Sequence, residues 1–146
     1  MIDPLHLDFE LRCAADHAFE VWTTRPSLWW PSSHTVSTAD GLSVTFEPRV
    51  GGRIFERTPE GVEHDWGEVT TWEPPLRLGY LWHLRRDRAD ATDVLITFAP
   101  RGEDRCRVSI EHRRWERLGA DATRWRETNR EGWGGVVPHF VAAAEA

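Results

Sequence analysis

The 146-residue sequence contains no lysine, and all 18 of its basic residues are arginine. With 24 acidic residues the net charge is −6, and no basic stripe runs along the chain. Such a charge distribution does not attract a phosphate backbone, so we expect no nucleic-acid partner. We interpret the missing lysine as a bias of genomic composition; selection for bidentate pairing with carboxylates is the alternative.

Cysteine is almost absent as well, with Cys13 and Cys106 alone. A zinc site needs four ligands at short spacings, and the histidines form neither an HxH nor an HExxH pair. We therefore expect no metal and no cofactor. The two thiols are interpreted as small apolar core side chains, with a disulfide as the alternative.

Long apolar runs are missing too. No stretch approaches the ~20 residues that cross a membrane. The start, Met1-Ile2-Asp3-Pro4, has neither the basic residues nor the apolar run of a signal peptide. We expect a cytoplasmic protein with no membrane partner, and the length and the 40% hydrophobic content fit one globular domain over residues 1–146.

The sequence is rich in tryptophan, with nine residues, and in runs of period two. Apolar and polar residues alternate from Leu5 to Cys13, and six later runs stand between turn signals such as Gly51-Gly52 and Pro74-Pro75. Alternation of this kind predicts half-buried antiparallel strands. The later runs are Leu42–Phe46, Arg53–Arg57, Glu63–Trp72, Leu78–Trp82, Val94–Phe98 and Cys106–His112. The ambiguous phase of the fourth strand predicts a bulge near Gly67.

Two segments have helical signals. Asp16 offers an N-cap to a short helix through about Thr23, and a second helical turn or an anchored loop follows at Leu28–Pro31. From Asp121 to the end of the chain, apolar residues recur at steps of three and four, which predicts a long C-terminal helix. Pro138 should kink this helix, and Gly132, Gly134 and Gly135 should allow another segment to approach it closely.

Several motifs resemble those of one superfamily. The run from Val44 to Gly52 resembles the strand-turn motif of the SRPBCC (START-like) proteins. Trp66-Gly67-Glu68-Val69, the run Glu73–Leu78 with Trp82, and Gly132-Trp133 are similar to the branch named after activators of a heat-shock chaperone ATPase. The resemblance implies an α+β helix-grip fold. In that fold a curved seven-stranded antiparallel sheet packs on a long C-terminal helix, with two short helices after the first strand.

One helix cannot fill a strongly curved sheet, so we expect an apolar cavity between them. The resemblance implies binding of lipids, polyketides or other hydrophobic molecules, and in some relatives cyclisation or aromatisation. The leading hypothesis is a carrier or sensor of a small hydrophobic molecule, and the first alternative is a cyclase- or aromatase-like enzyme. The second alternative is a module that stimulates a chaperone ATPase. The separate N-terminal domain with which eukaryotic activators grip the chaperone is missing here, which argues against a chaperone partner.

The predicted ligand-binding residues are those expected to face the cavity: Arg53, Phe55, Trp66, Tyr80, Trp82, Phe98, His112 and Trp133. The alternatives are that the rings fill the core, that Ile54 faces inward in place of the arginines, and that His112 is a satisfied core residue. No catalytic residue is identified, although Glu68 and His112 could form an acid–base pair. Trp29 and Trp30 form either a lid or an anchor, and Trp115 and Trp125 form either a homodimer patch or part of the core.

Overall fold

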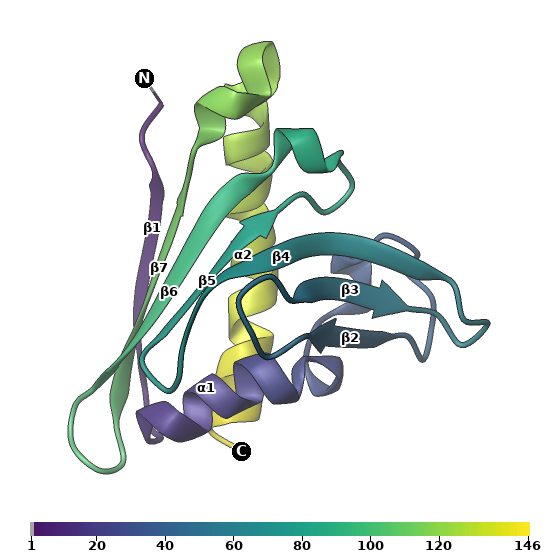
Figure 1. Ribbon diagram of the computed structural model, residues 1–146. Coiled ribbons are helices and arrows are strands. Elements are labelled where there is room, and N and C mark those ends of the chain that lie inside the picture. Colours follow the sequence, from purple (N-terminus) through teal and green to yellow (C-terminus); the bar gives the residue numbers. More distant parts are fainter. Residues whose placement is uncertain (1) are drawn as a thin grey trace.

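In the computed structural model, which describes residues 2–146, seven antiparallel strands form one sheet in the order β1-β7-β6-β5-β4-β3-β2. The strands are β1 (Leu5–Leu11), β2 (Ser43–Phe46), β3 (Arg53–Arg57), β4 (Glu63–Glu73), β5 (Arg77–Trp82), β6 (Thr92–Pro100) and β7 (Cys106–Arg113). The helices are α1 (Ala15–Thr24) and α2 (Ala122–Ala144), with 3-10 segments at Pro26–Leu28, Ser32–His34, Arg88–Asp90 and Trp115–Asp121. The predicted meander is confirmed, and β1 closes it by pairing with β7 (Figure 1).

Two irregularities bend β4 and decide which of its side chains face inward. The pairing of β3 with β4 shifts register beside Gly67, which confirms the predicted bulge. A methyl group at Gly67 would lie 1.9 Å from the carbonyl oxygen of Leu81, so β5 can approach this closely only because the residue is glycine. A second shift, between Val69 and Thr71, was not expected from the sequence. With both bulges in place, Trp66 and Val69 are fully buried.

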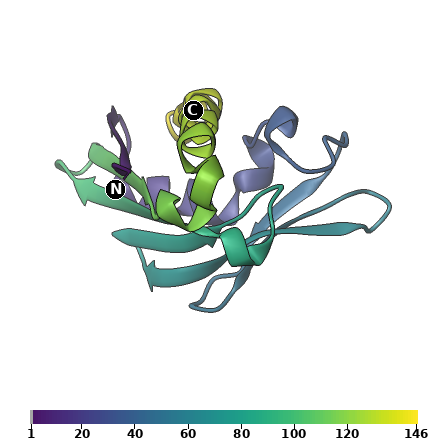
Figure 2. The same cartoon turned by 90° about the horizontal axis from the view of Figure 1, so that it is seen from above.

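Helix α2 lies along the concave side of the sheet, as Figure 2 shows, and confirms the predicted C-terminal helix. The residues that it buries recur at steps of three and four: Trp133, Val136, Phe140 and Ala144. The helix runs through Pro138 without ending there. Asp121 occupies its N-cap position but makes no capping bond through its side chain.

Helix α1 packs on the same side and joins an aromatic core. Phe19 lies edge-on to Phe98 of β6 with ring centroids 5.4 Å apart, and Trp22 lies edge-on to Phe140 of α2 at 4.7 Å. Edge contacts of this kind contribute about 0.5–1.5 kcal/mol each beyond the buried area. The predicted N-cap is wrong, because Asp16 lies inside the first turn of α1 and Ala14 stands at the cap position. Aromatic rings and aliphatic side chains such as Ile96 and Ile110 together form the core of the domain.

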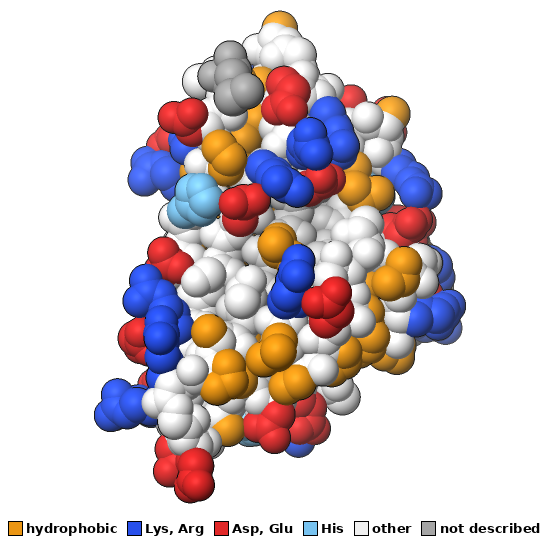
Figure 3. Space-filling view, turned by 60° about the vertical axis from the view of Figure 1, so that its left-hand side comes forward, with side chains coloured by type: hydrophobic (Ala, Val, Ile, Leu, Met, Phe, Trp, Pro, Cys, Tyr) orange, Lys and Arg blue, Asp and Glu red, His pale blue; other side chains and the backbone are white. Residues whose placement is uncertain are grey.

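Charged side chains of both signs intermingle on the face shown in Figure 3, and no field of one sign dominates it. Between the adjacent strands β1 and β7, Arg107 pairs with Asp8 at 3.7 Å and with Glu10 at 3.4 Å. Solvent-exposed pairs contribute at most about 1 kcal/mol each. The stability of this fold therefore depends on the aromatic core rather than on its surface charges.

Two further sequence predictions concern residues near the ends of the strands. Cys13 and Cys106 are free thiols, and burial raises the pKa of Cys106 to about 12.

Trp115 is fully buried, and Trp125 is half-buried. Trp115 is therefore part of the core, whereas Trp125 is only partly covered and belongs to neither predicted alternative in full.

Candidate functional site

A pocket of about 350 Å³ opens between α2, the end of β5 and the Ser32–His34 segment. Four indole rings line it: Trp82 on β5, Trp30 after α1, and Trp125 and Trp133 on α2. The pocket lies between the sheet and α2, as predicted, but it occupies only one end of that space. Its volume is at the lower end of the range for small-molecule sites in proteins.

Trp30 separates this pocket from the interior. Its ring centroid lies 5.8 Å from that of Trp82, which lines the pocket. The same ring also lies 5.1 Å from Trp66 and 6.4 Å from Trp22, both fully buried. The indole N–H of Trp30 donates to the carbonyl oxygen of His34 at 3.0 Å, which fixes the ring to the segment at the pocket mouth. Trp30 is therefore a packed wall in this structure.

His112 lies behind the pocket wall and is fully buried. The indole N–H of Trp133 donates to its Nδ1 at 3.0 Å, and because an indole can only donate, Nδ1 carries no proton. Nε2 therefore donates to the hydroxyl oxygen of Thr92 at 2.7 Å, and that hydroxyl donates to the carbonyl of Trp82 at 3.3 Å. Burial lowers the pKa of His112 to about 3, so its ring is neutral at neutral pH. His112 thus holds the indole of Trp133 directly and the backbone of Trp82 through Thr92, and it does not line the pocket.

Arg85 connects the two loops at the mouth of the pocket. It follows β5 with a φ of +65°, a left-handed conformation that is uncommon outside glycine. Its guanidinium donates to the carbonyl of Thr35 from Nε at 3.0 Å and from Nη2 at 2.5 Å, and to the carbonyl of Ser33 at 3.5 Å. The loop after β5 is therefore held against the segment that carries His34.

Glu56 binds the backbone just after His34 and so helps to hold this part of the pocket mouth in place. It lies on the inner face of β3, fully buried. Its carboxylate accepts the backbone N–H groups of Val36 at 2.6 Å and Ser37 at 2.9 Å, and the indole N–H of Trp66 at 2.8 Å. Burial acts to raise the pKa of Glu56, but the hydrogen bonds from Ser37, Val36 and Trp66 outweigh it and hold the pKa below its usual range. A charged group therefore stays ionised inside the protein because three donors satisfy it.

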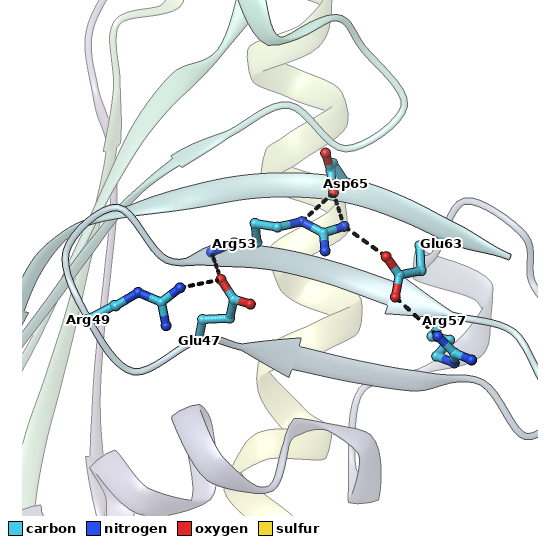
Figure 4. Close-up of polar contacts among 6 residues, drawn as sticks. All are labelled: Glu47, Arg49, Arg53, Arg57, Glu63 and Asp65. Carbon is cyan, nitrogen blue, oxygen red and sulfur yellow. Dashed lines mark hydrogen bonds and ion pairs between the residues drawn. The ribbon is translucent and has the colours of Figure 1, made fainter. Parts of the chain in front are cut away.

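Arg53 and Phe55 are corrections to the predicted site, because both lie on the outer face of the sheet. The guanidinium of Arg53 binds Asp65 at 2.7 Å and Glu63 at 3.1 Å (Figure 4). It also sits 4.1 Å from the centroid of the Phe55 ring. Alternation along β3 places Ile54 and Glu56 inward, as the alternative reading of this strand allowed. The arginine has its carboxylate partners on the surface and contributes nothing to the pocket.

Glu68 is a second correction. It pairs with Arg88 at 2.8 Å, and it stands opposite Arg53 in the register of β3 with β4. The bulge beside Gly67 changes the phase of β4, so Glu68 faces outward although Trp66 faces inward. An acid–base pair of Glu68 with His112 is therefore excluded, since the sheet separates the two side chains.

Three predicted wall residues, Trp66, Tyr80 and Phe98, are fully buried in the core. Burial raises the pKa of the Tyr80 hydroxyl well above its usual value. Of the predicted aromatic set, only Trp82 and Trp133 line the pocket. The sequence allows both core packing and cavity lining for these rings, and the structure divides them between the two roles.

The sequence predictions missed several residues of the pocket, among them His34, Arg85 and Asn129. No local pattern marks them, because they come from a short 3-10 segment, a loop and the polar side of a helix. One signal was present for Glu56, since it alternates in phase with the apolar Ile54 on the same strand.

Comparison with known proteins identifies the family. A model of the family described as Activator of Hsp90 ATPase homolog 1-like protein matches residues 12–145. The chain belongs to this family. Among curated proteins, no sequence matches it.

Solved structures share the fold. The anthrahydroquino-gama-pyrone synthase Txn09, solved as a complex, is 33% identical, with 84% of each chain covered and a TM-score of 0.60. The self-sacrificing resistance protein CalC from Micromonospora echinospora is 22% identical, with 97% of this chain and 94% of the other covered and a TM-score of 0.70. An HSP90 activator from Plasmodium falciparum is 18% identical, with coverages of 76% and 72% and a TM-score of 0.56. The curved sheet and the long C-terminal helix of the present chain are those of the helix-grip fold.

Residues 2–146 contain neither a metal-binding group of side chains nor a helix that could span a membrane. No group of three or more histidine, cysteine or acidic side chains is arranged to hold a metal ion. None of the helices in this part of the chain combines the length and the apolar character that a membrane span requires.

Proposed function

We propose that the protein binds a small hydrophobic molecule, as a carrier or sensor, in the pocket between α2 and the end of β5. The observation that supports this most is the pocket of about 350 Å³ with four indole rings in its wall. Large rigid rings bury much apolar area and lose few torsional degrees of freedom, so they suit flat apolar ligands. The volume suits a molecule of a few fused rings.

The test uses two leucine substitutions on the same helix. Gly132 lines the pocket, whereas a side chain at Gly134 would meet open space. With 2-methoxynaphthalene as the probe, calorimetry should find binding to the wild type and to Gly134→Leu. Gly132→Leu should weaken that binding at least about tenfold, because its side chain occupies the cavity. Equal affinity in all three proteins would refute a site in this pocket.

A cyclase-like enzyme acting in the same pocket is favoured by one observation, the 33% identity to a pyrone synthase. The acid–base pair that the sequence suggests, His112 and Glu68, does not line the pocket. Conversion of an aromatic polyketide by the wild type and by Gly134→Leu, but not by Gly132→Leu, would support the enzyme. Binding without conversion would support the carrier. Stimulation of a chaperone ATPase has no support beyond the family's description.

A further inference from the structure

The pocket lining contains ring nitrogens that bind no other group within residues 2–146, among them the buried indole nitrogen of Trp125 and the Nε2 atom of His34. The Nδ1 atom of His34 lies 3.0 Å from the hydroxyl of Ser33, within hydrogen-bond distance. Across residues 2–146, Nε2 of the same ring has no hydrogen-bond partner, and the residue is half-buried in the pocket wall. Unlike the indole nitrogen of Trp125, this Nε2 atom is not closed off from water. A ligand hydroxyl can therefore take the place of the water that binds it.

Glycine in α2 makes the room for this imidazole. A Cβ atom at Gly135 would lie 2.6 Å from Nε2 and 2.7 Å from Cε1 of His34. Any other residue at this position would therefore displace the ring. The next glycine along the helix toward the N-terminus, Gly134, has nothing within 4 Å of the same construction. A side chain at Gly135 would thus move the imidazole of His34, whereas a side chain at Gly134 would not.

The surroundings keep this imidazole neutral. Burial, the guanidinium of Arg85 and the ring of His139 lower the pKa of His34 below its usual value, in that order of effect. Glu131, on α2, is the acidic residue in the pocket lining. A neutral imidazole offers either one N–H or one lone pair at Nε2, depending on which nitrogen holds the proton.

A ligand for this site needs a flat face that packs against the indoles and, at its edge, a group that hydrogen-bonds to Nε2 of His34. A hydroxyl group can donate to Nε2 in one tautomer and accept from it in the other. We infer that the pocket selects planar aromatic molecules that carry a hydroxyl group, and that His34 is the residue which binds that hydroxyl. This inference rests on the proposed function and adds the class of ligand to it.

The test compares three probes that share one ring system: 2-naphthol, its methyl ether 2-methoxynaphthalene, and 2-naphthoate. Calorimetry at neutral pH should show that the wild type binds 2-naphthol about threefold to tenfold more tightly than the ether, the range expected for one hydrogen bond. Equal affinity for the two would overturn the inference. Tightest binding of the carboxylate would also overturn it, because Arg85 would then be the selecting group.

Matched variants identify the residue responsible. His34→Phe keeps a ring of similar size and removes the ring nitrogens, so it should lose the preference for 2-naphthol over the ether. Gly135→Ala should lose the preference too, while Gly134→Ala should keep it. A preference that survives in His34→Phe would refute the role of the imidazole. If the wild-type protein binds neither 2-naphthol nor the ether, the proposed function itself fails. If it binds both, and none of these substitutions alters the ratio of the two affinities, only the present inference fails.

Discussion

Acid should destabilise this protein through one buried imidazole, that of His112. In the folded state its Nδ1 accepts the indole N–H of Trp133 and has no room for a proton of its own. Burial lowers its pKa to about 3, whereas a histidine in an unfolded chain titrates near 6.5. As the pH falls, the unfolded chain is protonated first. Stability is therefore lost below about pH 6.5, and this loss ends near the folded-state pKa.

The size of the effect follows from the two pKa values. Once the unfolded chain alone binds the proton, each pH unit removes about 1.4 kcal/mol from the free energy of unfolding. Between pH 6 and pH 4 the loss from His112 comes to about 2.5 kcal/mol, because protonation at pH 6 is still incomplete. That is a large share of the 5–15 kcal/mol that typically stabilises a domain.

Urea unfolding at pH 6, 5 and 4 measures this loss. His112→Gln removes the titrating group and keeps one donor and one acceptor, so its stability should fall less over this range, by about 2.5 kcal/mol, than that of the wild type. His6→Gln is the matched control, since the side chain of His6 is 61% exposed on β1. An equal fall in the wild type and in His112→Gln would refute the assignment of the acid response to this ring.

Three further substitutions probe the fold and the pocket. Gly67→Ala should reduce the free energy of unfolding in urea by more than about 2 kcal/mol, because the new methyl would overlap the backbone of β5. Gly134→Ala should raise the same free energy by up to about 1 kcal/mol. If the two substitutions changed stability equally, both predictions would be wrong. Glu56→Gln should cost about 1–3 kcal/mol and speed hydrogen exchange in the segment after His34, and unchanged exchange would mean that this carboxylate does not hold the segment. Arg53→Met should change stability by less than about 1 kcal/mol and leave the affinity for 2-methoxynaphthalene unchanged; a tenfold loss of affinity would return Arg53 to the binding site.

Local patterns account for most of the fold. Alternation predicts the strands, and on β5, β6 and β7 it also predicts the inner face, since Tyr80, Phe98 and His112 are all buried there. It is ambiguous on β3, where Phe55 is apolar and Glu56 is charged. The charged residue faces inward because donors from another segment satisfy it, and the five residues of the strand contain no sign of those donors.

The pocket depends on contacts between distant parts of the chain, which is why the sequence predicts only part of it. Its four indoles come from a loop, a strand and two turns of a helix. Whether such a ring fills the core or lines a cavity depends on small differences in packing. Trp66 and Trp82 differ in this way although both lie on neighbouring strands and their centroids are 5.7 Å apart.

The ring contacts around Trp30 have an optical consequence. Its centroid is 5.1 Å from Trp66 and 5.4 Å from Trp29, and Trp22 lies 6.2 Å from Trp133. At such separations, electronic excitation migrates between indoles before it is emitted. A bound chromophore that absorbs in the emission band of tryptophan should therefore quench the fluorescence of rings that it never touches. The intrinsic fluorescence of the buried tryptophans, and not only of those in the pocket wall, then reports whether the pocket is occupied.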